Sequence, residues 1–420
     1  MSRQINNTDA PNRHRDAYPV GAAPRVLAQG RLAARSLRIT DTTFRDGQQA
    51  GEPFTLPAAV ALHAVLARLD AGSGRIAQTE LFLYSDRDRA LLDAIRGTGA
   101  AASPEPTAWI RADPRDLALV RGAGVAETGI LSSASDHHIY GKLRWTRREA
   151  FDRYVELVRA VIDAGIRPRV HLEDVTRADL DGFVLPLAGA LAELGRERGV
   201  PVKLRLCDTL GLGLPWREAA LPRSVPRLVE AIRSAGVAGE QLEWHGHDDL
   251  GKVHANATAA WLAGCTAVNG TLGGIGERTG NEPIELAAVE LAGLDPDSGL
   301  DLAALGDLPA ALAAAGAPVS PRRPVIGADA FLTRAGVHID GLLKDPEIYL
   351  PFDPALVGRT ADVALNDRSG AAGVAWVLGR DKRDPVVEAV AARIAAAYAG
   401  GRTTDVSPAE VRELAADLAA

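Results

Sequence analysis

The sequence predicts an α/β protein: a (β/α)8 TIM barrel followed by a C-terminal, mostly helical subdomain. The first observation is periodicity, because eight strand-like segments alternate with helical segments over about 260 of the 420 residues. The second is that the polar motifs follow the ends of these strand-like segments, where a barrel gathers its functional groups. The third is a change after about Leu300 to alanine-rich helical segments that are too long for one barrel helix.

The expected strands are short runs rich in apolar residues, and the expected helices carry apolar residues three and four positions apart. The pattern predicts strands over 37–41, 79–84, 107–111, 127–132, 167–173, 201–207, 241–247 and 267–272. It predicts helices over 56–69, 86–96, 113–122, 146–164, 179–199, 223–235 and 254–263. Two more amphipathic helices are expected near the end of the chain, over 385–399 and 407–419.

These segments divide the chain into four parts. Residues 1–35 are polar and contain proline, so we expect a flexible N-terminal extension. Residues 36–295 form the expected catalytic barrel, and residues 296–325 form a linker region. Residues 326–420 form the expected helical subdomain, which packs against the barrel or reaches over it.

Composition and charge narrow the classes of function. The hydrophobic content of 47% and the charged content of 24% are ordinary for a soluble globular protein. A net charge of −7, without a basic cluster interleaved with aromatic residues, argues against a nucleic-acid partner. The chain has no apolar run long enough for a membrane span and no secretory signal, so we expect a cytoplasmic protein. Cys207 and Cys265 fit a reducing compartment and are expected to be buried.

The stretch from His245 to Gly251, His-Gly-His-Asp-Asp-Leu-Gly, is the first candidate metal site. His245 and His247 occupy positions i and i+2 of an expected strand and therefore point to the same face. Two imidazoles and a carboxylate are a common set of ligands for a divalent metal, and they leave positions open for a substrate. Taken alone, the two histidines could equally be polar residues at a strand end.

Two further strand ends carry groups of a compatible kind. Arg45 and Asp46 follow the first strand, where Asp46 is well placed as a third metal ligand. Arg45 beside it can stabilise negative charge that develops on an oxygen. The eighth strand leads into the glycine-rich segment 269–281, where Asn281 can offer a carbonyl oxygen to a metal. This segment has neither the phosphate-loop lysine nor the dinucleotide fingerprint.

Three motifs in this order resemble one enzyme family. They are Asp41-Thr-Thr-Phe-Arg-Asp-Gly-Gln-Gln49, the stretch from His245 to Gly251, and Gly274-Ile-Gly-Glu-Arg-Thr-Gly-Asn281. Together they resemble the metal-dependent, acyl-CoA-condensing barrels, the family of isopropylmalate and homocitrate synthases, over roughly residues 36–360.

The resemblance implies a divalent metal ion, of the Mn, Mg, Co or Zn type, and acetyl-CoA as a co-substrate. Asp46, His245 and His247 would be metal ligands, with Asn281 as a fourth candidate, and Arg45 would steady the oxyanion. In this family the enolate of acetyl-CoA adds to the ketone carbon of a 2-oxo acid, and hydrolysis of the thioester releases CoA. A base must therefore act near the acetyl methyl group.

The segment from Arg334 to Tyr349 resembles the part that homocitrate synthases lend to the active site, often across a dimer. The resemblance implies that His338 is a general base or relay and that Tyr349 is a hydrogen-bond donor. It also implies a homodimer in which the C-terminal subdomain reaches the partner barrel. Without the resemblance, His338 would more often be a histidine satisfied inside a subdomain core.

The fifth and sixth strands are expected to form the acceptor pocket. Arg169, His171 and Glu173 lie at i, i+2 and i+4 of one strand and so share a face, and Thr209 follows the next strand. The resemblance implies that Arg169, His171 and Thr209 bind the 2-oxo acid and that Glu173 is catalytic. Taken alone, Glu173 could be part of a surface salt bridge. On an inward face it would be a buried charge that requires a partner or a catalytic role.

Within the family, segments 132–140 and 171–179 depart from the isopropylmalate pattern and resemble the group of Re-type citrate synthases and 2-phosphinomethylmalate synthase. This implies oxaloacetate, or a phosphinate or phosphonate analogue such as phosphinopyruvate, as the acceptor, and antibiotic biosynthesis as one setting. Homocitrate formation from 2-oxoglutarate and isopropylmalate synthesis remain alternatives. A metal-dependent lyase or aldolase on the same barrel, and a metal-bound scaffold without catalysis, also remain open.

Overall fold

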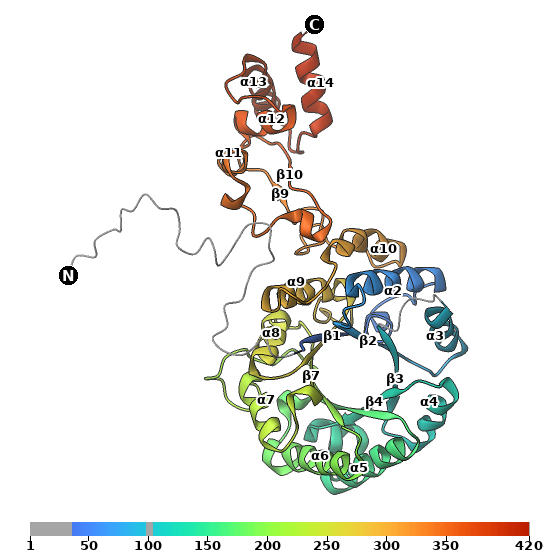
Figure 1. The fold of residues 1–420 in the computed structure, drawn as a ribbon. Coiled ribbons are helices and arrows are strands. Elements are labelled where there is room, and N and C mark those ends of the chain that lie inside the picture. The colour runs from blue at the N-terminus through green and yellow to red at the C-terminus, as the bar shows by residue number, and fades with distance from the viewer. Residues whose placement is uncertain (1–35, 98–103, 420) are drawn as a thin grey trace, which may run out of the picture. The chain divides into compact units, whose positions relative to one another are not determined.

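The computed structural model describes residues 36–97 and 104–419, and the N-terminal extension expected over 1–35 lies outside them. Its main sheet is a closed barrel of parallel strands in the order β1 to β8, with β8 paired to β1 (Figure 1). The predicted (β/α)8 fold is therefore confirmed. The strands are β1 (Arg38–Asp41), β2 (Ile76–Leu81), β3 (Glu105–Arg111), β4 (Glu127–Ser133), β5 (Arg167–Glu173), β6 (Lys203–Asp208), β7 (Leu242–Gly246) and β8 (Ala267–Gly270).

Helices surround the strands of the barrel (Figure 1). In the described ranges, no helix is both long and apolar enough to cross a bilayer. The helices up to residue 319 are α1 (Asp46–Gln49), α2 (Leu56–Asp70), α3 (Asp86–Gly97), α4 (Leu117–Ala123), α5 (Arg147–Asp163), α6 (Leu185–Arg198), α7 (Val225–Ser234), α8 (Val253–Ala263), α9 (Ile284–Leu294) and α10 (Leu308–Ala314). The later ones are α11 (Gly336–Lys344), α12 (Gly370–Leu378), α13 (Pro385–Ala399) and α14 (Pro408–Ala419).

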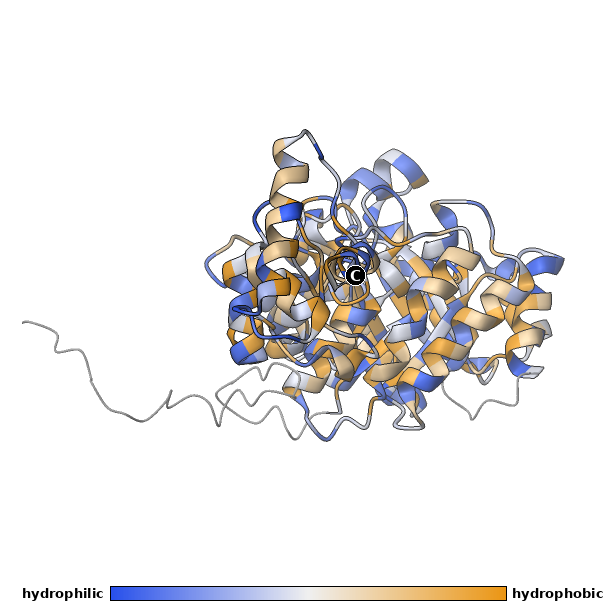
Figure 2. Cartoon of the chain, turned by 90° about the horizontal axis from the view of Figure 1, so that it is seen from above, coloured by the Kyte–Doolittle hydropathy of each residue, from blue (hydrophilic) through white to orange (hydrophobic). Residues whose placement is uncertain are grey.

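Helix α5 illustrates how the sequence starts and orients a helix. The backbone N–H of Glu149 donates to the Thr146 hydroxyl, and the Glu149 carboxylate accepts from the Thr146 N–H, which together form a capping box. The helix then buries Tyr154, Val158 and Val161, which are spaced by four and three residues. Figure 2 shows apolar and polar stretches side by side along the helices. Helix α5 packs on β4 and β5 with its apolar face.

The second strand begins earlier than the sequence pattern predicts. The expected range was 79–84, whereas β2 runs from Ile76 to Leu81. The reason is that β2 turns Gln78 and Glu80 into a charged barrel interior, so its inward positions carry no apolar signal. Phe82 then follows the strand and packs its ring against Trp109, with the centroids 5.3 Å apart. The apolar residues that follow β2 therefore gave the strand-like pattern that the sequence analysis assigned to 79–84.

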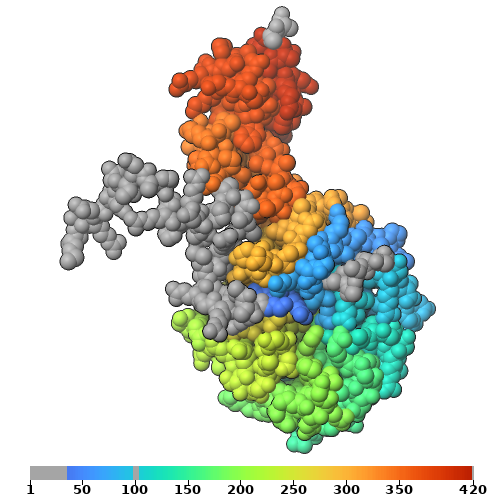
Figure 3. All heavy atoms as spheres, in the orientation of Figure 1, coloured from blue at the N-terminus to red at the C-terminus, as the bar shows by residue number. Residues whose placement is uncertain are grey.

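The interior of the barrel holds a lattice of buried charges. Arg169 donates to Glu80 at 2.9 Å and to Glu243 at 3.3 Å. Arg205 donates to Glu80 at 2.9 Å and to Glu243 at 3.0 Å. All four side chains are buried. In the space-filling view of Figure 3, atoms occupy the area inside the ring of strands that the ribbon of Figure 1 outlines. Because charges this deep are costly to leave unpaired, the lattice ties β2, β5, β6 and β7 together.

The chain divides into two compact units between Val319 and Ser320. This division falls inside the linker region that the sequence predicts over 296–325. The first part of that region contains η7 (Leu302–Asp307) and α10, which pack on α2. Arg68 of α2 also pairs with Asp307 at 2.7 Å. The sequence of this part is rich in alanine, but its leucines, Leu302, Leu305, Leu308 and Leu312, are buried.

The C-terminal unit has a small core of its own. Two short parallel strands, β9 (Leu332–Thr333) and β10 (Asp362–Val363), pair within it. Helices α12, α13 and α14 pack together beyond them. Their shared core consists of Leu365, Val374, Ala375, Val387, Val390, Ile394, Val406 and Val411. The expected helices over 385–399 and 407–419 are present as α13 and α14.

The charge lattice predicts that loss of a buried arginine lowers the free energy of unfolding more than loss of an exposed one. Arg205→Met leaves Glu80 and Glu243 short of a buried partner and should lower the free energy of unfolding by about 3–5 kcal/mol. Arg217, which pairs with Glu230 at the surface, is the matched control, and Arg217→Met should cost less than about 1 kcal/mol. Urea unfolding of both variants, followed by tryptophan fluorescence, measures the difference. Equal losses in the two variants would contradict the lattice as a stabilising feature.

Candidate active site

The sequence motifs converge on one cavity at the C-terminal ends of the strands. It has a volume of about 230 Å³ and is open to solvent at the barrel mouth. Of the residues singled out in the sequence, those that line it are Arg45, Asp46, His171, Glu173, Thr209, His245 and His247. Strands β1, β5, β6 and β7 deliver these side chains, so segments far apart in the chain meet at one place.

The two histidines of the β7 motif present free ring nitrogens. Their ring centroids lie 5.2 Å apart, and His245 Nε2 lies 3.6 Å from the Oδ2 atom of Asp46. His247 Nδ1 is buried and has no hydrogen-bond partner among the described residues. Burial lowers the pKa of both imidazoles to about 4. Both rings are therefore neutral near pH 7, which is the form that binds a metal.

Asn281 joins these histidines from the loop after β8. Its backbone bridges to that of His247, and neither polar atom of its buried amide has a partner among the described residues. The side chain fits because residue 276 is glycine: a Cβ atom there would lie 1.9 Å from Asn281 Oδ1. Asn281 itself does not line the cavity. Its buried, unpaired amide oxygen, on a segment paired with that of His247, is the kind of donor that suits a divalent ion.

Asp46 is the remaining candidate metal ligand, and it forms an ion pair with Arg45. Asp46 Oδ2 accepts from Arg45 at 2.6 Å, while Arg45 Nε donates to Glu80 at 2.6 Å. Burial acts to raise the pKa of Asp46, but Arg45 and, after it, His245 and His247 together hold the pKa below its usual value. Within the described ranges, no three His, Cys, Asp or Glu side chains already close around one point. The second carboxylate oxygen of Asp46 leaves it able to keep Arg45 and still bind a metal.

Glu173 stands at the cavity edge as a carboxylate. It accepts from Ser133 at 2.6 Å and from the Lys142 ammonium at 2.7 Å, and His138 Nδ1 lies 2.9 Å away. Burial opposes ionisation, yet these partners lower the pKa of Glu173 to about 2. The side chain is only 17% exposed. Glu173 is thus an inward carboxylate with partners, rather than part of a plain surface salt bridge.

His171 and Thr209 line the same cavity from β5 and from the end of β6. His171 Nε2 lies 3.4 Å from Glu80 Oε2, and burial lowers the pKa of His171 to about 4. Gly129 of β4 makes room for this pair, since a Cβ atom there would lie 2.5 Å from His171 Nε2. Thr209 Oγ1 accepts from the Asp174 N–H at 2.9 Å, and its carbonyl accepts from Arg278.

Arg169 lies beneath the cavity instead of in it. It is 1% exposed, does not line the cavity, and donates to Gln78, Glu80 and Thr107 in the barrel interior. The sequence correctly places Arg169 and His171 on the same face of β5. Arg169 comes two residues earlier in the strand than His171, farther from the C-terminal end where the cavity lies, so its side chain lies deeper in the barrel. In this structure Arg169 supports Glu80 and does not contact the acceptor space.

His338 and Tyr349 belong to the C-terminal unit. Both are exposed on that unit, so His338 is not a satisfied core histidine. Their rings stack with centroids 4.3 Å apart. Gly341 permits this arrangement, because a Cβ atom there would lie 2.4 Å from the Tyr349 ring.

Several lining residues were not singled out by the sequence reasoning. Glu277 and Arg278 lie inside the glycine-rich motif, and Trp109 lies near the end of β3, a position that the barrel fold marks as part of the mouth. Cys207 was expected only to be buried. It is buried, and it also lines the cavity. The additional lining residues are Gln49, Trp109, Leu131, Cys207, Glu277 and Arg278.

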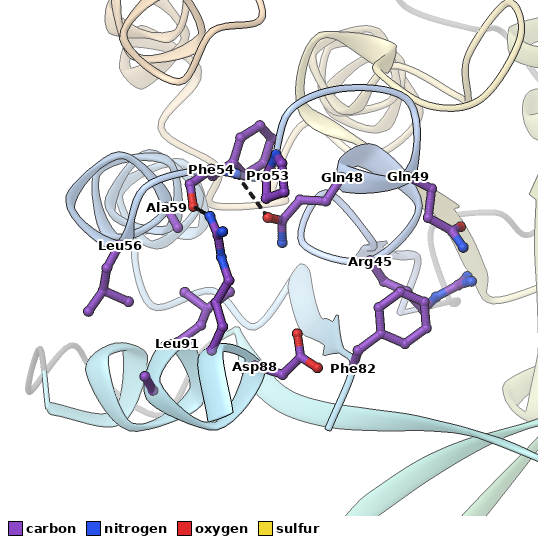
Figure 4. Close-up of a pocket in the computed structure, with 12 residues that line it drawn as sticks. Arg45, Gln48, Gln49, Pro53, Phe54, Leu56, Ala59, Phe82, Asp88 and Leu91 are labelled. Carbon is purple, nitrogen blue, oxygen red and sulfur yellow. Dashed lines mark hydrogen bonds between the residues drawn. The ribbon is translucent and has the colours of Figure 1, made fainter. Parts of the chain in front are cut away.

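A second cavity, of about 260 Å³, shares Arg45 and Gln49 with the first. Its walls are mostly apolar and come from the loop after α1, from α2 and from α3 (Figure 4). Phe54 forms part of one wall. Two hydrogen bonds hold it there: its N–H donates to Gln48 Oε1 at 3.1 Å, and its carbonyl accepts from Arg87. The apolar lining includes Pro53, Phe54, Leu56, Ala59, Phe82 and Leu91.

Two family models match the chain. One, described as HMGL-like, covers residues 36–311, and one described as homocitrate synthase post-HMGL domain-like covers residues 325–380. Among solved structures, hydroxymethylglutaryl-CoA lyase from Pseudomonas aeruginosa has a TM-score of 0.55 at 22% identity, covering 67% of this chain and 94% of that chain. This last similarity supports the fold alone.

Among curated relatives, the citrate (Re)-synthase of Syntrophus aciditrophicus (strain SB) is 43% identical, covering 97% of this chain and 68% of the relative. The 2-phosphinomethylmalate synthase of Streptomyces hygroscopicus is 38% identical, covering 97% of this chain and 96% of the relative. The first model spans every barrel strand, and the second spans the segment with His338 and Tyr349. The chain therefore belongs to the HMGL-like family, in the branch whose barrel is followed by a homocitrate synthase post-HMGL domain-like segment.

Proposed function

We propose that the chain is an acyltransferase that condenses acetyl-CoA with a short 2-oxo acid carrying a second anionic group. Oxaloacetate, or a phosphinate analogue such as phosphinopyruvate, is the proposed acceptor. The acyl group becomes an alkyl group on transfer, and the products are a citrate-like 2-hydroxy acid and free CoA. The observation that carries this proposal is the shared cavity, in which candidate metal donors face Glu173 and His171. The 43% and 38% identical relatives named above support it.

Asp46, His245, His247 and Asn281 would hold a divalent metal ion of the Mn, Mg, Co or Zn type. When bound, such an ion polarises the ketone of the acceptor and offsets negative charge on its oxygen. Arg45 adds a positive group on the same side of the cavity. Because Glu80 already fixes Arg45 Nε at 2.6 Å, the guanidinium needs little reorganisation as charge develops.

The proton and bond changes define what the side chains must do. A base takes a proton from the acetyl methyl group, the resulting carbon nucleophile bonds to the ketone carbon, and the ketone oxygen gains a proton. Water then cleaves the thioester and CoA leaves as the thiol. We assign His338 as the base, with Tyr349 as a hydrogen-bond donor. Glu173, held as a carboxylate by Ser133 and Lys142, is the proposed catalytic carboxylate on the barrel.

His338 would be supplied by the partner chain of a homodimer. The support is that His338 sits among exposed apolar side chains of its unit: Val337 is 71% exposed and Ile348 is 50% exposed. Apolar groups gathered around an exposed histidine suit a surface that is covered by another chain.

The acceptor's second anionic group would lie on the side of the cavity formed by His171, Thr209 and Arg278. Arg278 is held over this side by Asp249 at 2.6 Å and by the Thr209 carbonyl at 2.7 Å. Polar and cationic groups favour a carboxylate or phosphinate there over a branched alkyl group, which can accept no hydrogen bond from them.

The second cavity is the proposed site for the pantetheine arm of acetyl-CoA. It opens beside Arg45 and Gln49, which also line the acceptor cavity, so a thioester lying across the two would reach the ketone. Its apolar walls suit a flexible arm with methyl and methylene groups.

The acceptor assignment predicts a ranking of substrates. Free-thiol release from acetyl-CoA should be fastest with oxaloacetate or phosphinopyruvate, slower with 2-oxoglutarate, and at least about tenfold slower with 2-oxoisovalerate. A thiol reagent follows all four reactions side by side in metal-supplemented protein. Equal rates with the branched acid would rule out the anionic acceptor pocket.

The base assignment predicts a loss in turnover with little change in substrate binding. His338→Ala should lower kcat by about 10²–10⁴-fold. Lys344→Ala, an exposed change on the same helix, should leave kcat near the wild-type value. Full activity in His338→Ala would remove His338 from the mechanism.

Mixing variants tests whether the base comes from the partner. Inactive His338→Ala and His247→Ala proteins, unfolded together and refolded, should regain about a quarter of wild-type activity. The reason is that half of the dimers are mixed and each mixed dimer holds one complete site. No recovery, in samples shown by mass spectrometry to contain mixed dimers, would place His338 and His247 of one chain in the same site.

The pantetheine site predicts a selective change in KM. Leu91→Ala removes an apolar wall of the second cavity and should raise the KM for acetyl-CoA by about tenfold, since burial against a side chain of this kind contributes about 1.5–3 kcal/mol. The KM for the acceptor is the internal control and should stay within about twofold. A rise in the acceptor KM alone would contradict this placement.

A further inference from the structure

A hydrogen bond fixes His245 from the side opposite the cavity. His245 Nδ1 lies 2.7 Å from the Oδ1 atom of Asn269 in β8. Asn269 Nδ2 lies 3.1 Å from the backbone oxygen of Thr40 and 2.9 Å from the Thr40 hydroxyl. All three side chains are buried. Nothing in the proposed mechanism so far uses Asn269 or Thr40.

The direction of each of these hydrogen bonds follows from the chemistry of the atoms. A backbone carbonyl oxygen can only accept, so the group of Asn269 that faces Thr40 must be its NH₂. The amide oxygen then faces His245, and an oxygen there can only accept. His245 Nδ1 must therefore carry the proton, which leaves the lone pair on Nε2. Nε2 is the atom that lies 3.6 Å from Asp46 Oδ2.

The charge lattice enforces the same direction independently. The Thr40 hydroxyl bonds Glu243 Oε1, and a carboxylate can only accept, so Thr40 donates to Glu243 and accepts from Asn269. Glu243 in turn accepts from Arg205, which also donates to Glu80.

From Glu80 the chain of contacts returns to the site through Arg45, whose Nε donates to Glu80 and whose NH2 donates to Asp46. Two metal donors from different elements, His245 on β7 and Asp46 at the start of α1, are thus joined by one continuous chain of buried hydrogen bonds. Arginine can only donate in this chain and a carboxylate can only accept, so no hydrogen bond in it can reverse its direction without leaving a buried group unpaired.

We propose that Asn269 is a positioning residue that holds His245 in the Nδ1–H tautomer, with Nε2 aimed at the metal site. The inference rests on the metal site of the proposed function and not on the identity of the acceptor. Partners of this kind, which orient a metal-binding histidine without touching the metal, typically change metal affinity by 10–100-fold when they are removed.

The first test reads the tautomer directly in metal-free protein. Long-range ¹H–¹⁵N spectra of ¹⁵N-histidine-labelled protein distinguish Nδ1–H from Nε2–H, and His245→Gln identifies the resonance. The wild type should show His245 as Nδ1–H. Asn269→Leu removes the acceptor and should give Nε2–H or a mixture. A wild-type His245 in the Nε2–H form would overturn the proposal.

The second test measures Mn²⁺ affinity by titration calorimetry. Asn269→Leu should bind Mn²⁺ about 10–100-fold more weakly than the wild type. Asn269→Asp keeps an oxygen acceptor for His245 and should stay within about threefold of the wild type or bind more tightly. Asn256→Leu is the matched control, because Asn256 is equally buried and donates only to the Gly213 carbonyl. It should bind like the wild type.

The outcomes separate this inference from the proposed function. A wild-type protein without Mn²⁺ affinity would remove the proposed metal site itself. A wild type that binds, with Asn269→Leu equal to Asn256→Leu, would overturn only the role of Asn269. If Asn269→Leu does not fold, Asn269→Asp decides: folded protein with affinity lowered more than about tenfold would show that Asn269 acts merely as a tie to Thr40.

Discussion

The structure depends on the convergence of three arginines on one buried carboxylate. Glu80 accepts from Arg45 at 2.6 Å and from Arg169 and Arg205 at 2.9 Å. Burial would raise the pKa of Glu80, but Arg205 and the other cations hold it well below its usual value. A charge this deep persists only where its partners are complete. The need to neutralise Glu80 therefore determines two features: Arg169 and Arg205 fill the barrel interior, and Arg45 is held at the mouth.

This constraint explains how a rigid floor and an open cavity coexist. Beneath the mouth, arginine and carboxylate groups are paired and their hydrogen-bond directions are fixed. The side chains at the mouth that bond to them, such as Arg45, are therefore held in a defined orientation. At the mouth itself, His247 Nδ1 and both polar atoms of the Asn281 amide are buried without partners among the described residues. Polar groups left in this state are a cost to folding that a bound ligand relieves. The arrangement favours binding of a cation by these donors over a purely structural role.

The sequence predicted the barrel because its strands and helices keep their hydrophobic periods, and it predicted the cavity because strand ends of a parallel barrel share one mouth. It misplaced β2, since Gln78 and Glu80 face a charged interior that carries no apolar signal. It could not separate Arg169 from His171 by depth, because strand periodicity gives the face of a residue and not its height in the barrel. Gly129 and Asn269 were invisible for a similar reason: their importance comes from a neighbour on another strand, His171 for one and His245 for the other.

The central claim is that Asp46, His245 and His247 hold one metal ion that faces a 2-oxo acid. Anomalous diffraction from crystals soaked in Mn²⁺ and oxaloacetate tests it most directly. The account predicts one strong anomalous peak within bonding distance of Asp46, His247 and the Nε2 atom of His245, with the acceptor on the cavity side. A peak elsewhere on the barrel, or a His245 ring turned to bind through Nδ1, would contradict it.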